Sequence, residues 1–458
     1  MTRVARLCIG ALLVACCVLA SCASAPPVQP AANTATAEVE GRASSDPLAN
    51  VRNVPAKQKV LFVIGQDSDT LERFRKEVLE VPAHADMRIP GGVTLYTGMV
   101  PTFLHDNTAP KDATLYVSGI EGPPADYGNG NVDFSKTLAE YDEFNGKRKT
   151  AIAVGLYLSD AWKDCANQPL RALVASGDRD VGVASDGRSL VHQWRYAVDR
   201  MLHWFAKQQR PVFLRIGYEF DGPWNCYSRE HYKAAFRYIK SRIDAIGAAN
   251  VATVWQAATY PDDGDPSRHY AASVDTQQHY EDWFPGEDVV DWIGVSFFSG
   301  KRYLEYQWSC PDASKPWTVP ETSPRYLQDQ LLAMARRYGK PALIAESAPQ
   351  GTDSRALTWS CTAQRQDHLD GHAFPGGQAL WDSFFADYFD WIEANEDVIR
   401  AFAYINTNWQ AQQRWACAPR AASCSEGYWG NTSLQGNEEL LRLFKRELGK
   451  PLYDARPE

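Results

Sequence analysis

The chain of 458 residues lacks an excess of positive charge, metal-binding motifs and internal repeats. Lysine and arginine number 47 against 56 aspartate and glutamate, and the net charge of −9 argues against nucleic acid or an acidic polymer as a partner. No Cys-x-x-Cys or His-Glu-x-x-His motif occurs, so the sequence indicates no metal site and no cofactor. Nothing supports a Ser–His–Asp hydrolase either. Aromatic residues are abundant instead, with 15 Trp and 21 Tyr, and such rings either pack in cores or line sugar-binding clefts.

The first residues form a targeting segment. Two arginines precede an apolar run from Leu7 to Leu19, which is too short to span a bilayer as a stable helix. The run ends in Leu-Ala-Ser-Cys, which resembles a bacterial lipobox. We therefore expect a lipoprotein signal peptide over residues 1–21, lipid on Cys22, and a flexible Ala/Pro/Thr-rich tether up to residue 57. A plain secretory signal cut near residues 23–25 is the alternative.

The targeting segment also predicts where the protein works. A lipid on Cys22 would anchor it in the bacterial cell envelope, at the outer membrane or the cell surface and outside the cytoplasm. Ala23, rather than Asp, after the cysteine fits outer-membrane sorting in a Gram-negative host. We expect a monomer that has the membrane as one partner.

Six cysteines follow Cys22, and an even number in an exported protein favours disulfides over metal ligands. Six cysteines allow fifteen connectivities. Sequence proximity and expected positions after strands suggest three pairs, namely Cys165 with Cys226, Cys310 with Cys361, and Cys417 with Cys424.

Beyond the tether, short apolar runs alternate with amphipathic helical patterns, which indicates a parallel sheet with helices on its outer face. Eight such units predict a single (β/α)8 TIM barrel with long strand-to-helix loops over residues 58–458. The second strand is the weakest assignment, because Asp112–Gly119 competes with Val93–Thr97. The expected strands are Val60–Gly65, Val93–Thr97, Ala151–Leu158, Val212–Gly217, Val251–Gln256, Val290–Phe297, Ala342–Ala345 and Ile399–Ile405.

Two of these strands end in a glutamate. Glu219 follows the fourth strand and Glu346 ends the seventh. Catalytic groups of TIM barrels lie at the carboxyl ends of the strands, and the fourth and seventh strands lie on opposite sides of the mouth. Two facing carboxylates are what hydrolysis of a glycosidic bond requires. The alternative is that either glutamate is a structural ion-pair partner, for instance of Arg215.

Three passages resemble a known family. They are Arg215–Trp224 around the first glutamate, Trp283–Ser296 leading into the sixth strand, and Pro341–Glu346. They are similar to clan A retaining glycoside hydrolases, most of all to glycoside hydrolase family 26, which contains β-mannanases and some β-1,3-xylanases and lichenases. The resemblance implies that Glu219 is the acid/base and Glu346 the nucleophile.

The sequence departs from the family pattern at three positions. Family mannanases have His before the acid/base and Asn two residues after it, where this chain has Tyr218 and Asp221. Phe298 stands where a Tyr often contacts the nucleophile. The substrate therefore stays open among mannan, β-1,3/1,4-glucan and xylan types, and a non-catalytic glycan-binding lipoprotein on a glycosidase-like barrel is the alternative function.

Other side chains at the strand ends are candidates for substrate contacts. Asp67, Asp160 and Trp162 also follow strands, but a capping or turn role is expected for the two aspartates. His231, His269, His279 and His372 show no ligand spacing and are expected to be polar surface residues. We expect Arg215 to keep Glu346 ionised, and Phe220 and Trp224 to desolvate Glu219. The expected substrate-binding residues are Arg215, Tyr218, Asp221, Trp224, Trp255, Phe298, Asn406 and Trp409.

Overall fold

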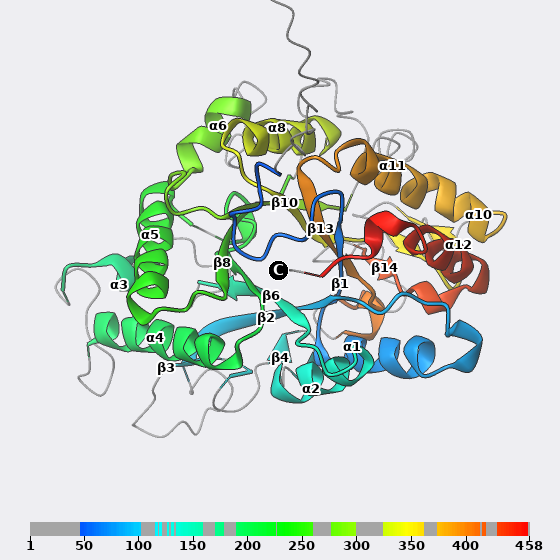
Figure 1. Ribbon diagram of the computed structural model, residues 1–458, viewed down its shortest axis with the longest axis horizontal. Helices are drawn as coiled ribbons and strands as arrows, with labels where there is room; N and C mark the ends of the chain where they lie inside the picture. The colour runs from blue at the N-terminus through cyan, green and yellow to red at the C-terminus, as the bar shows by residue number, and fades with distance from the viewer. Residues whose placement is uncertain are drawn as a thin grey trace, which may run out of the picture. The chain divides into compact units, whose positions relative to one another are not determined.

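The protein forms a closed barrel of eight parallel strands ringed by helices (Figure 1). This confirms the predicted (β/α)8 fold. The computed structural model describes residues 46–101, 115–117, 119–120, 126–127, 130–131, 134–158, 170–177, 189–225, 227–259, 276–298, 324–360, 373–412, 415–417 and 428–456.

All eight expected strands form, and β1 pairs with both β13 and β2, which closes the barrel. The expectation that Val93–Thr97 supplies the second strand is confirmed. In the described part of the competing segment, Leu115–Val117 forms β3, which pairs antiparallel with the far end of β2. The barrel strands are β1 (Leu61–Gly65), β2 (Gly92–Pro101), β6 (Ala151–Tyr157), β7 (Val212–Ile216), β8 (Val251–Ala257), β9 (Trp292–Phe297), β10 (Ala342–Ser347) and β13 (Ile399–Ile405).

The strands are apolar on both faces because each face packs against a different core. Inward side chains such as Phe213, Val254 and Ala403 fill the barrel interior. Outward side chains such as Leu214 and Phe402 pack under the helices. This two-sided burial explains why the strands read as continuous apolar runs instead of alternating ones.

The helices cover the outside of the barrel with one apolar stripe each. In α5 (Arg229–Ile246) the buried residues recur at three- and four-residue steps, and the helix ends at Gly247, whose φ of 74° suits glycine. The other helices are α1 (Ser68–Phe74), α2 (Phe134–Phe144), α3 (Leu170–Val174), α4 (Leu190–Gln208), α6 (Thr276–Trp283), α8 (Pro324–Arg337), α10 (Gly377–Leu380), α11 (Ala386–Ala394) and α12 (Glu438–Leu448).

Short strands occur in the segments that follow the barrel strands. Strand β11 (Thr352–Asp353) pairs with β12 (Thr358–Trp359) and with β14 (Gly430–Asn431). Strand β4 (Asp126–Tyr127) pairs with β5 (Gly130–Asn131). The first of these sheets joins the segments after β10 and β13, at the end of the barrel where the strands finish.

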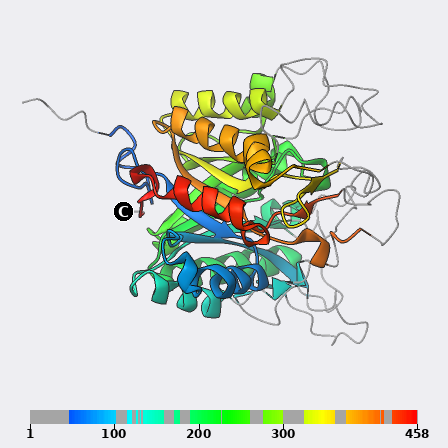
Figure 2. The ribbon, with the colours of Figure 1, turned by 90° about the vertical axis from the view of Figure 1, so that its right-hand side faces the viewer.

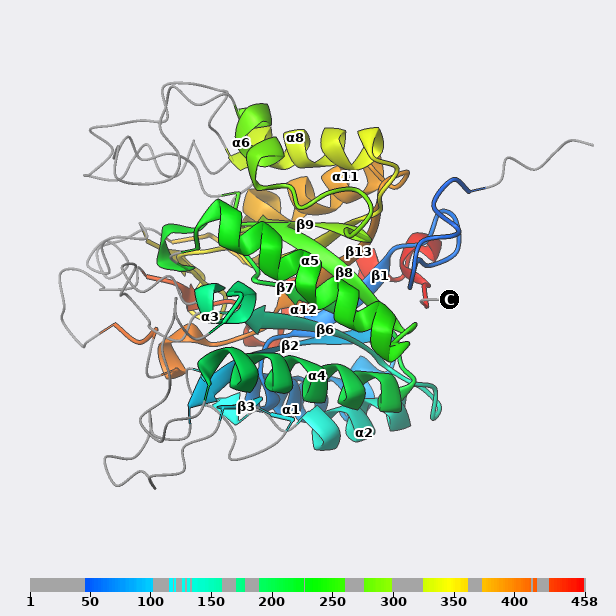
Figure 3. The same cartoon turned by 90° about the vertical axis from the view of Figure 1, so that its left-hand side faces the viewer.

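The segment before β1 belongs to the compact unit Asp46–Glu458. Leu48 and Val54 are buried in the interior core of the barrel. In the side views, these first described residues and the C-terminus lie together at one end of the barrel (Figures 2 and 3). The unit therefore begins at Asp46, before the boundary at residue 58 that the composition suggested.

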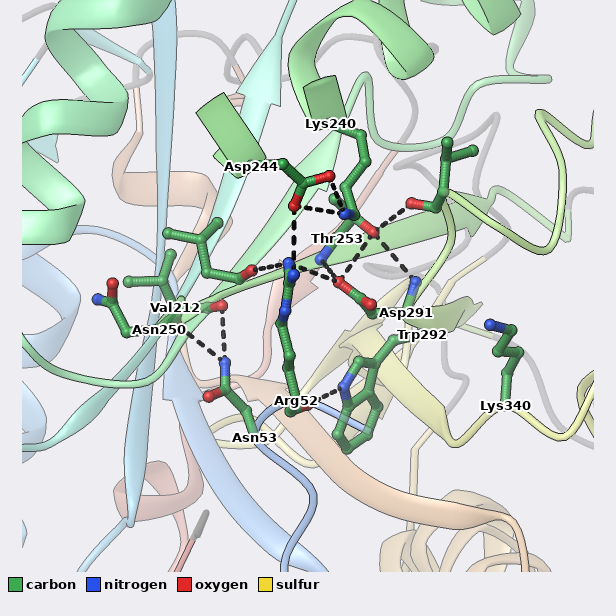
Figure 4. Close-up of polar contacts among 12 residues, drawn as sticks. Arg52, Asn53, Val212, Lys240, Asp244, Asn250, Thr253, Asp291, Trp292 and Lys340 are labelled. Carbon is green, nitrogen blue, oxygen red and sulfur yellow. Dashed lines mark hydrogen bonds and ion pairs between the residues drawn. The ribbon is translucent and has the colours of Figure 1, made fainter. Parts of the chain in front are cut away.

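Backbone carbonyls and one side chain at the base of the strands hold this segment (Figure 4). The Asn53 Nδ2 atom donates to the carbonyl oxygens of Val212 and Asn250, at 3.0 and 3.1 Å. The indole N–H of Trp292 donates to the Arg52 carbonyl at 2.8 Å. Because Val212 starts β7 and Trp292 starts β9, the segment closes the barrel at the end opposite the carboxyl ends of the strands.

Among the described residues, no helix is both long enough and apolar enough to cross a membrane.

Candidate active site

Glu219 lies in a tight turn that directly follows β7. Gly217 and Glu219 both have positive φ, at 53° and 50°. This conformation is uncommon for a glutamate and marks a position that the surrounding structure imposes. The Asn225 Nδ2 atom donates to the carbonyls of Tyr218 and Glu219, at 2.9 and 2.8 Å, and so fixes the turn. The turn directs the Glu219 side chain to the buried hydroxyl of Ser296, with the two oxygens 2.9 Å apart.

Glu346 reaches the same site because β10 contains a register irregularity. Leu343 and Ala345 face the barrel interior, whereas Ile344 belongs to the outer core. Strict alternation would therefore send Glu346 outward. The pairing of β10 with β9 shifts between Ile344 and Glu346, and a bulge of this kind re-aims the following side chain. Glu346 consequently meets the side chain of Arg215.

Arg215 connects Glu346 to the neighbouring strands. Its Nη1 atom donates to Glu346 Oε1 at 2.5 Å and to Gln256 Oε1 at 3.1 Å, and its Nη2 atom donates to Thr94 Oγ1 at 3.1 Å. The guanidinium is fully buried. It fits because Gly155 has no side chain, and a Cβ there would lie 2.8 Å from Nη2. A buried charge needs such pairing, and here the carboxylate of Glu346 supplies it.

Two tyrosines flank the guanidinium. Its Cζ atom lies 4.8 Å from the ring centre of Tyr96 and 5.4 Å from that of Tyr218, and the rings are 5.1 Å apart. Contacts of this kind stabilise a cation. Burial and the negative charge of Glu346 raise the pKa of Tyr96, so its phenol stays protonated.

A continuous set of hydrogen bonds joins the two carboxylates. Ser296 donates to Glu219 Oε1 at 2.9 Å and accepts from Gln256 Nε2 at 3.1 Å. The same Nε2 atom donates to Glu346 Oε1 at 3.3 Å. The sequence prediction that the two glutamates face each other in one barrel mouth therefore agrees with the network that the structure shows.

The surroundings of Glu219 favour its protonated form. Burial raises the pKa of Glu219 well above its ordinary value, and the charge of Glu346 raises it further. The Ser296 hydroxyl lowers the pKa of Glu219, and so does the Trp224 indole, which donates to Glu219 Oε2 at 3.0 Å. The net increase leaves Glu219 able to give a proton while Arg215 pairs with Glu346.

The expected desolvation of Glu219 by two aromatic neighbours is wrong in its details. Phe220 points away from the site and stacks on Trp255, with ring centres 4.5 Å apart. Trp224 touches Glu219 through its N–H, which stabilises the ionised carboxylate. Burial is the largest cause of the raised pKa of Glu219, and the hydrogen bond from Trp224 acts against it.

Trp255 lies outside the barrel mouth, although sequence position placed it among the substrate contacts. It is fully buried between β8 and the helices, near Tyr280 and Phe284. Its neighbour Gln256 faces inward and contacts Glu346. Successive residues of a strand point to opposite faces, so only one of these two side chains reaches the site.

Asp221 is also structural in its contacts. It is fully buried, and its Oδ1 atom accepts from the Ala258 backbone N–H at 2.7 Å. Its Oδ2 atom lies 3.3 Å from Nε2 of His279. His279 is 1% exposed, so the expectation of a surface histidine is wrong there. The pair ties the turn after β7 to the end of β8 and to α6.

The residues after β13 form a separate part of the rim. Asn406 is buried and bonds Gln435 Oε1 and the Leu434 backbone N–H, at 2.9 and 2.7 Å. Trp409 is 3% exposed and lies 4.8 Å from the ring centre of Trp429. Asn406 therefore holds the following turn, and Trp409 packs under other aromatic rings.

Phe298 joins the same aromatic group, because its ring centre lies 5.1 Å from that of Trp429. Trp415 and Trp429 are partly buried and complete the group, which we call the rim aromatic cluster: Phe298, Trp409, Trp415 and Trp429. The sequence pointed to Phe298 and Trp409 in this cluster. It gave no periodic signal for the other two, which come from an irregular segment.

Several site residues have only weak signals in the sequence. Thr94 and Tyr96 come from β2. Gly155 is a glycine inside a strand, and such a glycine often marks a place where another group approaches the strand backbone closely. Asn225 is an asparagine in a turn. The role of each residue depends on contacts with other segments, which the local sequence does not show.

Asp67 takes the expected capping role, since its side chain accepts from the Thr70 backbone N–H at the start of α1. Cys417 is disulfide-bonded. Its pairing stays a prediction, because Cys22, Cys165, Cys226, Cys310, Cys361 and Cys424, like Asp160, Trp162, His269 and His372, lie outside the described residues. Within the described part of the chain, no cluster of three or more His, Cys, Asp or Glu side chains could hold a metal ion.

Comparison with known proteins agrees with the resemblance indicated by the motifs. No protein-family model matches the chain. The chain is 26% identical over 397 residues to the β-1,3-xylanase TXYA of a Vibrio species, covering 86% of this chain and 66% of the relative. It is 29% identical over 344 residues to a β-1,3-xylanase of an Alcaligenes species, covering 74% and 61%. The chain thus spans less than two thirds of the length of either relative.

Solved structures with a similar fold include mannanases. An endo-β-1,4-mannanase double mutant from Cellulomonas fimi matches with a TM-score of 0.48 and 13% identity, over 89% of this chain and 73% of that one. A family 26 β-mannanase from Bacteroides ovatus matches with a TM-score of 0.47 and 15% identity, over 86% and 90%. In sequence, the chain resembles β-1,3-xylanases.

Proposed function

We propose that this protein is a retaining glycoside hydrolase that cleaves a β-linked polysaccharide of the mannan, β-1,3/1,4-glucan or xylan type. The observation that carries the proposal is the presence of two buried glutamates at the mouth of the barrel, Glu219 and Glu346, which Ser296 and Gln256 link by hydrogen bonds. The two carboxyls sit in different environments, and a two-carboxylate mechanism needs that difference.

In the first step the Glu346 carboxylate attacks the anomeric carbon while Glu219 transfers its proton to the leaving oxygen. The glycosidic bond breaks as the ester to Glu346 forms. In the second step Glu219, now ionised, takes a proton from water, and the resulting hydroxide displaces Glu346 from the sugar. Arg215 holds the Glu346 carboxylate in place, because its Nη1 atom lies 2.5 Å from Oε1.

The pKa of Glu219 supports both roles. In the free enzyme the charge of Glu346 keeps the pKa of Glu219 raised, which favours the acid form. Once Glu346 is an ester, that charge is gone and the pKa of Glu219 falls. The same carboxyl can then act as the base for water, as the retaining mechanism requires.

We propose β-1,3-xylan as the first substrate to test, because both curated relatives are β-1,3-xylanases. We expect the purified protein to release reducing ends from it, with initial products that keep the β configuration by NMR. Glu219→Ala should lower kcat/KM by about 10²- to 10⁴-fold, and Glu346→Ala by at least as much. Azide should partly restore either variant by replacing the missing carboxylate.

Glu230→Ala is a matched control, because Glu230 is exposed on α5. Near-normal activity in either active-site variant would refute the assignment, and inversion at the anomeric carbon would refute the retaining mechanism. If xylan is not cut, the same reducing-end assay on mannan and on mixed-linkage glucan identifies the substrate. Glycan binding without release of reducing ends from any of them would instead support the non-catalytic alternative.

We also propose that lipid on Cys22 anchors the enzyme in the bacterial envelope through the tether before the barrel. The Leu-Ala-Ser-Cys sequence at the end of the apolar run supports this. Cys22→Ala should abolish incorporation of labelled palmitate and release the protein from the membrane fraction. A variant that still sediments with membranes would contradict the anchor.

A further inference from the structure

One glutamine amide links the two glutamates, because it contacts Glu346 directly and reaches Glu219 through Ser296. The Gln256 Nε2 atom has two protons, and its partners are Ser296 Oγ at 3.1 Å and Glu346 Oε1 at 3.3 Å. Its Oε1 atom accepts from Arg215 at 3.1 Å. Because an arginine can only donate, the oxygen of the amide must face Arg215. The amide nitrogen therefore faces the carboxylate and the serine.

The same logic fixes the direction of the serine hydroxyl. Ser296 Oγ accepts from Gln256, so its own proton is free to point at Glu219 Oε1, 2.9 Å away. Gln256 and Ser296 are both fully buried, so water does not compete for these bonds. Hydrogen bonds that share a direction in such a site strengthen one another.

The fold leaves little freedom for this arrangement. Gln256 and Ser296 face inward from the adjacent strands β8 and β9, and Ser296 is paired in register with Glu346 on β10. Gly294, two residues before Ser296, lets Gln256 approach, because a Cβ there would lie 2.6 Å from the Gln256 Cβ. Three neighbouring strands therefore hold the set in one geometry.

We propose that Gln256 and Ser296 are positioning residues of the reaction, which hold the acid Glu219 and the nucleophile Glu346 in one hydrogen-bonded unit with the serine proton aimed at Glu219. This inference rests on the proposed glycoside hydrolase function. It assigns a role in the chemistry to two residues that do not contact the scissile bond themselves.

The serine bond has opposite effects on the two steps. A hydroxyl that donates to a carboxylate favours the ionised form. Ser296 therefore opposes the acid role of Glu219 and supports its role as the base. The other groups that act on Glu219 are Glu346 and Asp221, which raise its pKa, and Trp224, which lowers it. Arg215 and His279 are held against Glu346 and Asp221 rather than against Glu219.

The test compares Ser296→Ala with Ser296→Thr, which keeps the hydroxyl. In Ser296→Ala the alkaline limb of the profile of kcat/KM against pH should shift to higher pH by about one unit, because the ionised form of Glu219 loses a hydrogen-bond donor. With an activated aryl glycoside, kcat and KM should fall together about tenfold, since slower hydrolysis of the ester lets it accumulate. In Ser296→Thr the alkaline limb should stay at the same pH as in wild type.

Gln256→Leu should move the alkaline limb in the same direction, because Ser296 then loses the donor that orients it. Ser241→Ala is the matched control, since Ser241 is exposed on α5 and bonds only a nearby backbone carbonyl. An unchanged limb in Ser296→Ala, even with a lower kcat, would overturn the proposal and leave a purely structural role.

A second measurement keeps the inference separate from the proposed activity. Carbon-13 NMR of labelled glutamate carboxyls, assigned with Glu219→Gln, follows the titration of Glu219 without substrate. We expect a higher midpoint in Ser296→Ala than in wild type, and equal midpoints would overturn the inference. A protein that titrates as expected but cuts no glycan would refute the proposed function alone.

Discussion

Gly155→Ala tests whether the position of Arg215 controls the site. A Cβ on residue 155 would lie 2.6 Å from Cδ1 of Tyr96 and 2.8 Å from Nη2 of Arg215, both closer than real contacts allow. Tyr96 is backed by Tyr218 at 5.1 Å, so the ring has little room to move away. The added methyl must therefore displace the guanidinium, whose Nη1 atom is 2.5 Å from Glu346.

Overpacking of a buried site by one methyl costs about 1–3 kcal/mol. If the Arg215–Glu346 contact absorbs this cost, the same energy is lost from the transition state, and kcat/KM falls by about 5- to 150-fold. The assay is kcat/KM on the polysaccharide that wild type cuts, together with the urea unfolding midpoint. Gly177→Ala is the matched control, because no atom of the described residues lies within 4 Å of its added Cβ. Wild-type activity and stability in Gly155→Ala would refute the reasoning.

Two further predictions concern stability. A chain that starts at Asp46 should unfold in urea like the longer protein, whereas one that starts at Gln58 should lose more than about 4 kcal/mol, because Leu48 and Val54 leave the interior core; equal stability of the two would contradict a role for this segment. Glu219→Gln should remove a pH dependence of folding. Because the folded pKa of Glu219 is raised, the folded state binds more protons than the unfolded one, so wild-type stability falls as pH rises from the ordinary glutamate value towards the raised one. Unfolding free energies of wild type and Glu219→Gln should therefore diverge as pH rises, and parallel curves would show that the shift is absent.

The barrel was predictable because its strands are buried on both faces. Such strands are apolar runs of fixed length between amphipathic helices, and the eight runs coincide with the eight barrel strands. The positions of Glu219 and Glu346 at the strand ends were predictable as well, because each follows a buried apolar run, whereas their catalytic roles are a proposal. Both signals are local in the sequence, and both follow from the geometry of one strand.

The direction of individual side chains was not predictable in the same way. Trp255 and Gln256 are adjacent, and the choice of which one faces the mouth depends on the register of β8, which the sequence does not fix. The inward turn of Glu346 depends on an irregularity between two strands. The segment 46–57 joins the barrel only through distant partners such as Val212 and Trp292. Long-range pairing, unlike periodicity, leaves no local pattern.

Tyr218 and Asp221, the two residues near Glu219 that differ from the family pattern, affect the scaffold and the pKa of Glu219. Tyr218 packs against Arg215 and Tyr96, where it adds no charge next to the guanidinium. Asp221 accepts from the Ala258 backbone, a contact that an asparagine oxygen also makes, but its charge additionally raises the pKa of Glu219. Neither change removes a group that the two-step mechanism needs. We propose that any difference in substrate comes from elsewhere on the rim, where Phe298, Trp415 and Trp429 of the rim aromatic cluster are only partly buried and suit contact with sugar faces.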